Sequence, residues 1–83
     1  MAILRLPAVK AETGHRSDAS IYTMIRAGLF TKPVRISQRS VGWPSDEVQA
    51  INIALIAGQS KEQICALVET LHRGRTERIS EMP

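Results

Sequence analysis

The stretch that decides the fold is residues 13–27, T-G-H-R-S-D-A-S-I-Y-T-M-I-R-A. Gly14 opens a polar turn, and Ser17 is a typical N-cap for a helix that follows it. Three apolar residues then share one helical face, at i, i+3 and i+4: Ile21, Met24 and Ile25. Ser20, Thr23 and Arg26 fall on the opposite face. Two short helices joined by a glycine turn, the second with a polar and basic outer face, are the outline of a helix-turn-helix.

The segments on either side extend this outline. Ile3 to Leu6 is predicted to be a short extended entry, and Pro7 suits the first turn of a helix that ends at Gly14. The second helix is predicted to end at Ala27-Gly28. Val34-Arg35-Ile36 and Val41-Gly42-Trp43 alternate as strands do, so a β-hairpin is expected, with residues 37–40 as its polar, basic tip.

Two more helices are expected after the hairpin. One begins with Ser45 as a capping residue, followed by two acids. Its apolar residues Val48, Ile51 and Leu55 mark an inward face, and Ile53 with Ile56 marks a second face that should also be covered. The other helix, 60–73, begins with an S-x-x-Q capping box and carries a stripe at Ile64, Leu67, Val68 and Leu71. It is predicted to stop at Gly74.

Composition limits the classes of protein to consider. The chain has 83 residues, 43% of them apolar, and a single cysteine, which predicts one small domain without a disulfide. It shows no signal peptide and no apolar run of membrane-spanning length, so a cytoplasmic protein with no membrane partner is expected. Catalytic motifs are absent. Cys65 and His72 lie seven residues apart, but two ligands do not make a zinc site, so we expect no metal, cofactor or small-molecule substrate.

The charge is divided unevenly along the chain. Residues 1–43 hold seven basic and two acidic side chains, whereas residues 44–83 hold four basic and six acidic ones. A basic half favours a polyanionic partner, and double-stranded DNA is the one that suits a helix-turn-helix. The residues expected to contact it are Arg16, Ser17, Ser20, Thr23, Arg26, Lys32, Arg35, Gln38 and Arg39. Trp43 is assigned to the core rather than to base stacking, because it alternates with Val41 on the inward face.

Several ordered motifs resemble those of the AlpA-like family. They are I-L-R-L-P (3–7), T-G (13–14), S-x-x-x-I-Y (17–22), G-x-F-x-K-P-V-R-I (28–36) and V-G-W (41–43). These small phage and prophage transcriptional regulators are related to excisionases and to MerR-type proteins. The resemblance covers residues 3–51 and implies a mainly α fold with a small β-hairpin, a winged helix-turn-helix. It also implies that the second helix enters the major groove while the wing touches flanking backbone or minor groove.

The expected organisation therefore has three parts. Residues 1–57 form the winged helix-turn-helix, 58–74 a helix packed on it or used for dimerisation, and 75–83 a flexible tail. The expected function is sequence-specific DNA binding in transcription regulation, as a homodimer or a side-by-side array. Two alternatives stay open: an excisionase-like architectural factor, and a small protein–protein adaptor that has lost DNA binding. The turn at Gly14–Ser17 is one residue longer than the family's T-G-L-S.

Overall fold

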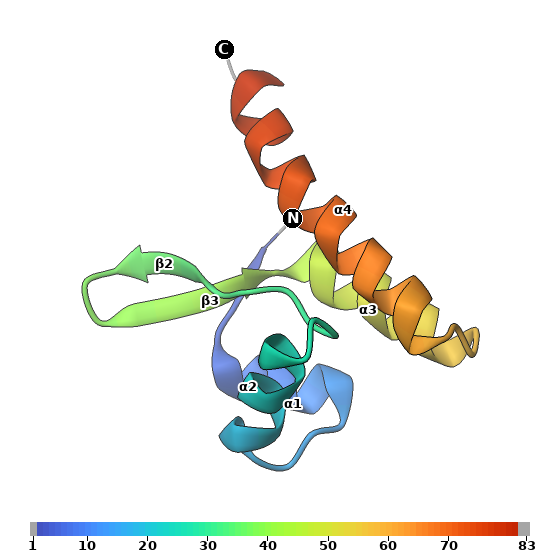
Figure 1. Ribbon diagram of the computed structural model, residues 1–83. Helices are drawn as coiled ribbons and strands as arrows, with labels where there is room; N and C mark the ends of the chain where they lie inside the picture. The colour runs from blue at the N-terminus through green and yellow to red at the C-terminus, as the bar shows by residue number, and fades with distance from the viewer. Residues whose placement is uncertain (1, 82–83) are drawn as a thin grey trace.

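The computed structural model describes the backbone of residues 2–81 and the side chains of residues 2–75. Within that range the chain is mainly helical with a small antiparallel sheet, which confirms the predicted fold class (Figure 1). The elements in chain order are β1 (Ile3–Leu4), α1 (Leu6–Thr13), α2 (Asp18–Arg26), β2 (Val34–Ser37), β3 (Ser40–Pro44), α3 (Ser45–Ile56) and α4 (Lys61–Glu81).

The corner between α1 and α2 is built by local capping. Pro7 lies in the first turn of α1, and Gly14 ends that helix with a left-handed φ of 78°. Ser17 is the N-cap of α2, where its hydroxyl accepts the backbone N–H of Ser20 at 3.2 Å. Lys10 of α1 and Asp18 of α2 form an ion pair of 2.7 Å across the turn. The predicted ends of both helices are confirmed.

The three strands lie in the order β1-β3-β2. Opposite β1, Ile3 pairs with Pro44, and opposite β2, Val34 pairs with Gly42. Figure 1 shows the β2–β3 hairpin extending away from the helices, whereas β1 crosses only its base. The sequence predicted the hairpin, and the extended entry at residues 3–6 turns out to add a short third strand.

The core lies where the helices meet the base of the hairpin. Trp43 is fully buried at its centre, and its indole N–H donates to the Thr31 carbonyl at 2.9 Å. Tyr22 and Phe30 pack against the indole with ring centroids 6.4 and 6.3 Å away. The apolar core consists of Val9, Ile21, Phe30, Trp43, Val48, Ile51, Ala54, Ile64 and Val68. Trp43 is therefore a core residue, as predicted.

Three expectations for α3 are wrong. The helix begins at Ser45 itself, and the Ser45 hydroxyl accepts the N–H of Ala2 instead of capping the helix. The second apolar face is not covered within the described residues, because Ile53 is 59% and Ile56 85% exposed. Leu55 is exposed as well, and Ala54 takes the core position that was expected for it. Within the described residues, α3 packs against α1, β3 and α4, and the side chains of Ile53 and Ile56 stay exposed.

The fourth helix is longer than expected. Its capping box forms as predicted, since Gln63 N–H donates to the Ser60 hydroxyl and Ser60 N–H donates to the Gln63 side chain. The helix packs on α3 and continues through Gly74 to Glu81, so the predicted stop at Gly74 is wrong. Residues 75–81 are helical rather than a loose tail, and residues 82–83 lie outside the described residues. In Figure 1 the C-terminal half of α4 projects beyond the rest of the molecule.

Candidate nucleic-acid interface

The outer face of α2 presents short polar side chains and one arginine. Thr23 and Arg26 are exposed, and the Arg26 guanidinium donates to the Thr23 hydroxyl at 3.3 Å. Ser20 is half-buried, and its hydroxyl lies 2.9 Å from that of Ser17. The two serines therefore serve the start of the helix, while Thr23 and Arg26 remain accessible to a ligand.

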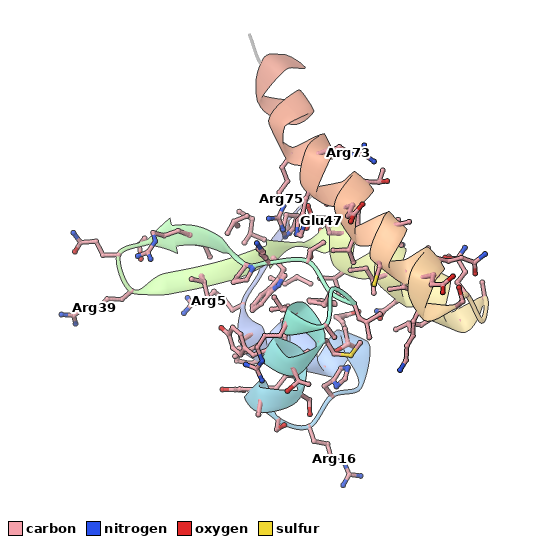
Figure 2. All side chains as sticks on the ribbon, viewed as in Figure 1. Arg5, Arg16, Arg39, Glu47, Arg73 and Arg75 are labelled. Carbon is pink, nitrogen blue, oxygen red and sulfur yellow. The ribbon has the colours of Figure 1, made fainter. Side chains whose placement is uncertain are left out.

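The turn and the hairpin tip each carry an exposed arginine. Arg16 lies in the turn between α1 and α2, and Figure 2 shows it pointing away from the body of the molecule. Arg39 lies at the hairpin tip and points outward in the same view. Arg35 has a bracing contact, because its guanidinium donates to the Gln38 carbonyl at 3.1 Å and so fixes the tip.

Arg5 is a basic residue that the sequence-based list of contacts missed. It is exposed, and in Figure 2 it lies between the hairpin and the α1–α2 corner. The place follows from the pairing of β1 with β3, which brings residue 5 beside the base of the hairpin. In Figure 2 Arg39 lies at the hairpin tip, Arg5 below the hairpin and Arg16 below the α1–α2 corner, all on the part of the molecule away from α4, and we call these three exposed arginines the basic surface.

Lys32, predicted to be a DNA contact in the loop after α2, has its backbone bound to α4. Its N–H donates to Nε2 of His72 at 3.0 Å, and its carbonyl accepts from the Arg75 guanidinium at 2.6 Å. It lines a groove of about 230 Å³ between the 28–32 loop and α4, together with Cys65, Glu69 and His72. The Lys32 backbone is therefore bound to α4, whereas its side chain is exposed.

Arg75 also forms a buried ion pair. Its Nε and Nη2 donate to the two carboxylate oxygens of Glu47 at 2.8 and 2.6 Å, and the Glu47 side chain is fully buried. We call Lys32, Glu47, His72 and Arg75 the α4 clamp, because α4 supplies the two side chains that bind the loop. Figure 2 shows Arg75 beside Glu47. The sequence analysis missed it: Glu47 was one of the two acids at the start of a helix, and His72 was considered only as a possible metal ligand.

The chemistry of His72 follows from its place in the clamp. As the acceptor of the Lys32 N–H, Nε2 carries no proton, so the imidazole is neutral. Burial lowers the pKa of His72 below its usual 6.5, and the Arg75 and Lys32 charges lower it further, against an opposing effect of Glu47. The sequence held one sign of this ion pair. Glu47 lies at helical spacing from Ile51 and Ala54, so it shares their inward face, where a carboxylate needs a partner.

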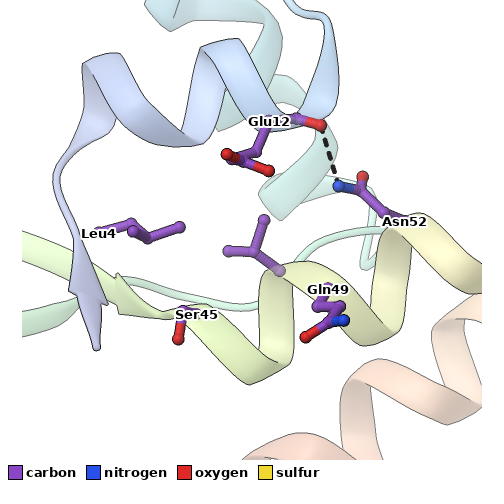
Figure 3. Close-up of a pocket in the computed structure, with 6 residues that line it drawn as sticks. Leu4, Glu12, Ser45, Gln49 and Asn52 are labelled. Carbon is purple, nitrogen blue, oxygen red and sulfur yellow. Dashed lines mark hydrogen bonds between the residues drawn. The ribbon is translucent and has the colours of Figure 1, made fainter. Parts of the chain in front are cut away.

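A second hollow lies between α1 and α3 (Figure 3). It has a volume of about 280 Å³, and the Asn52 side-chain amide donates to the Glu12 carbonyl at its edge, at 2.9 Å. Its lining residues are Leu4, Glu12, Ser45, Val48, Gln49 and Asn52. The one charged side chain among them is acidic, so this hollow is unsuited to a phosphate backbone.

Two searches of the described residues concern other kinds of site. No helix in that part of the chain is long and apolar enough to cross a membrane. Nor does it contain three or more histidine, cysteine or acidic side chains gathered as a metal ion would require. Cys65 is half-buried, with its sulfur 3.9 Å from the Ala27 carbonyl.

Comparison with known proteins finds one family. The model described as Prophage CP4-57 regulatory protein (AlpA) matches residues 2–50, well over half of the chain. The match runs from β1 through the helix-turn-helix and the hairpin into α3, and it leaves α4 outside. No curated protein and no solved structure matches the chain significantly.

Proposed function

The chain belongs to the AlpA family of prophage regulatory proteins, and we propose that it is a sequence-specific DNA-binding transcriptional regulator. The observation that carries this proposal is the basic surface. Exposed arginines from the N-terminal segment, the helix-turn-helix turn and the hairpin tip lie away from α4 in Figure 2, and α2 adds the exposed Thr23 and Arg26. The family is a regulatory one, which supports a binding function rather than a catalytic one.

In the proposed complex, α2 lies in the major groove of double-stranded DNA. Arg26 is suited to hold guanine through its two edge acceptors, and Thr23 reaches a base edge or a phosphate. Arg16 and Arg5 contact phosphates beside the turn and the hairpin base. The wing places Arg39 on flanking backbone or minor groove, with Arg35 and Gln38 holding the tip in shape. Ser17 and Ser20 contribute at the helix start, and Lys32 acts through long-range charge.

The exposed apolar side chains of α3 favour a second candidate function. Ile53, Leu55 and Ile56 are too exposed for core residues, and clustered exposed apolar side chains are typical of protein contacts. They are compatible with a homodimer or a side-by-side array on DNA, and equally with an adaptor that binds protein and not DNA. An adaptor would show no salt-sensitive retention of duplex DNA at micromolar protein.

Selection of bound duplexes from a random pool, followed by binding measurements on the selected site, tests the proposal. We expect Arg26→Ala to remove most of the discrimination against non-selected DNA, about 1–3 kcal/mol for one bidentate contact. Arg39→Ala should weaken binding to all sequences alike and reduce the slope of log K against log salt by about 1.

The matched control for both variants is Arg73→Ala. Arg73 is exposed on α4, away from the basic surface, so its removal subtracts the same charge from another side (Figure 2). It should leave sequence discrimination unchanged. Equal effects of Arg73→Ala and Arg39→Ala would mean that net charge, and not the wing, governs binding, and absence of any salt-sensitive binding would refute the proposed function.

A further inference from the structure

The loop between α2 and β2 joins the two parts of the proposed DNA-binding surface. It runs from residue 27 to 33 and is the direct chain connection between α2 and the hairpin. Within this loop the backbone of Lys32 binds α4 through both its N–H and its carbonyl, while the Thr31 carbonyl binds Trp43. These three hydrogen bonds fix two adjacent peptide groups, the one between Thr31 and Lys32 and the one between Lys32 and Pro33.

Both side chains that hold Lys32 come from a helix outside the family match. His72 and Arg75 are three residues apart on α4, so they share a face. Arg75 is itself fixed by the fully buried carboxylate of Glu47, which prevents the guanidinium from turning to solvent. The loop is thus bound by α4 side chains, one of which is itself held by a buried carboxylate.

We propose that the α4 clamp positions the wing relative to the recognition helix, so that α4 sets the geometry of the DNA-binding surface without touching DNA. This inference rests on the proposed function. His72 and Arg75 are positioning residues: they act on DNA through the loop backbone. Removing the acceptor at residue 72 frees the Lys32 N–H, and the hairpin then samples orientations in which Arg39 does not reach the DNA backbone.

A double-mutant cycle tests the proposal with matched variants of His72. His72→Leu removes the acceptor, whereas His72→Gln offers a side-chain carbonyl that can accept the same N–H. Arg39→Ala is then introduced into the wild type and into both variants, and affinity for the selected duplex is measured. In the His72→Leu background we expect the loss caused by Arg39→Ala to shrink by roughly threefold or more, as coupled sites show. In the His72→Gln background the loss should equal that in the wild type.

Equal losses in all three backgrounds would overturn the proposal, because a helix that only stabilises the fold leaves the Arg39 contact unchanged. A free-protein measurement separates this result from failure of the proposed function. Amide exchange of residues 32–42 should be faster in His72→Leu than in the wild type and His72→Gln, whether or not DNA binds. If wild type binds no DNA and the exchange rates are also equal, both proposals fail; if only the exchange difference is seen, the clamp stands and the DNA-binding function fails.

A pH series provides the same test without a destabilising variant, should His72→Leu not fold. The groups facing His72 are Arg75 and Glu69 on α4, Glu47 on α3 and Lys32 in the loop. A lowered folded pKa means that the contact is complete above pH 6.5 and is lost as the pH falls below 6.5 through the folded pKa. Wing protection factors should therefore fall on acidification in the wild type and stay constant in His72→Gln; parallel behaviour would overturn the proposal.

Discussion

Arg39 and Arg75 carry the same guanidinium group in opposite surroundings. Arg39 lies at the hairpin tip, where it is exposed and makes no hydrogen bond within the part of the chain that the structure describes. Arg75 is largely buried and makes three hydrogen bonds, two to Glu47 and one to the loop backbone. The first is available to a ligand, and the second is committed to the fold. The same residue type thus belongs to the proposed binding surface in one region and to an internal support in the other.

The largest effect should come from breaking the internal support. Arg75→Met leaves the fully buried Glu47 carboxylate without its partner, which typically costs about 3–5 kcal/mol. For a domain this small that is a large share of the free energy of unfolding, and urea denaturation measures it directly. The control is Arg73→Met on the exposed side of α4, which should change the free energy of unfolding by less than about 0.5 kcal/mol.

The double variant Glu47→Leu/Arg75→Met sharpens this test. It removes both charges, so no unpaired carboxylate remains in the core, and it should recover much of the stability that Arg75→Met loses. A single variant as stable as the wild type would show that Glu47 tolerates burial without Arg75. In that case Arg75 would not be required for the fold, and the contrast between Arg75 and the exposed Arg39 would disappear.

A smaller effect is expected where the hairpin joins β1. A Cβ on Gly42 would lie 2.6 Å from Cγ2 of Ile3, 2.9 Å from Cδ1 of Ile36 and 2.9 Å from the Leu4 carbonyl. The side chains can turn away, but the Leu4 backbone cannot without disturbing β1. Gly42→Ala should therefore cost about 1–3 kcal/mol, the usual range for overpacking. Thermal unfolding would check it, and an unchanged Tm would mean that β1 is loosely attached.

The sequence predicted the region around Arg39 far better than the region around Arg75. Helix ends at Gly14, Ser17 and Gly28 depend on residues a few positions away, and strand alternation is also local. The family resemblance stops in α3, and no such local rule describes how α4 packs. Glu47 and Arg75 are 28 residues apart, and Lys32 and His72 are 40 apart, so only the tertiary fold brings them together.

The same limit explains what the sequence analysis missed around the candidate site and what it predicted wrongly in α3. Lys32 stays a predicted DNA contact, since its side chain is exposed, but the bonds of its backbone to α4 leave no trace in the sequence. Arg5 was missed because only strand pairing brings it to the basic surface. Ile53 and Ile56 were expected to be covered, since apolar side chains do not reveal which of two faces a partner helix will choose.

The smallest predicted effect concerns Gly74→Ala, for which the sequence analysis and the structure predict changes of opposite sign in the free energy of unfolding. A glycine that ends a helix adopts a positive φ, and an alanine there is strained. Gly74 instead lies inside α4, its φ is not positive, and a Cβ would meet nothing within 4 Å. Gly74→Ala should therefore stabilise the protein by about 0.5–1 kcal/mol, because alanine loses less backbone entropy in a helix.

Gly14→Ala is the matched control: its surroundings are equally open, but its φ of 78° should make alanine cost about 1–2 kcal/mol. Urea denaturation of the two variants, measured side by side, tests this prediction. A destabilised Gly74→Ala would mean that α4 ends at Gly74. Arg75 would then lie outside a regular helix, and the α4 clamp would lack its rigid support.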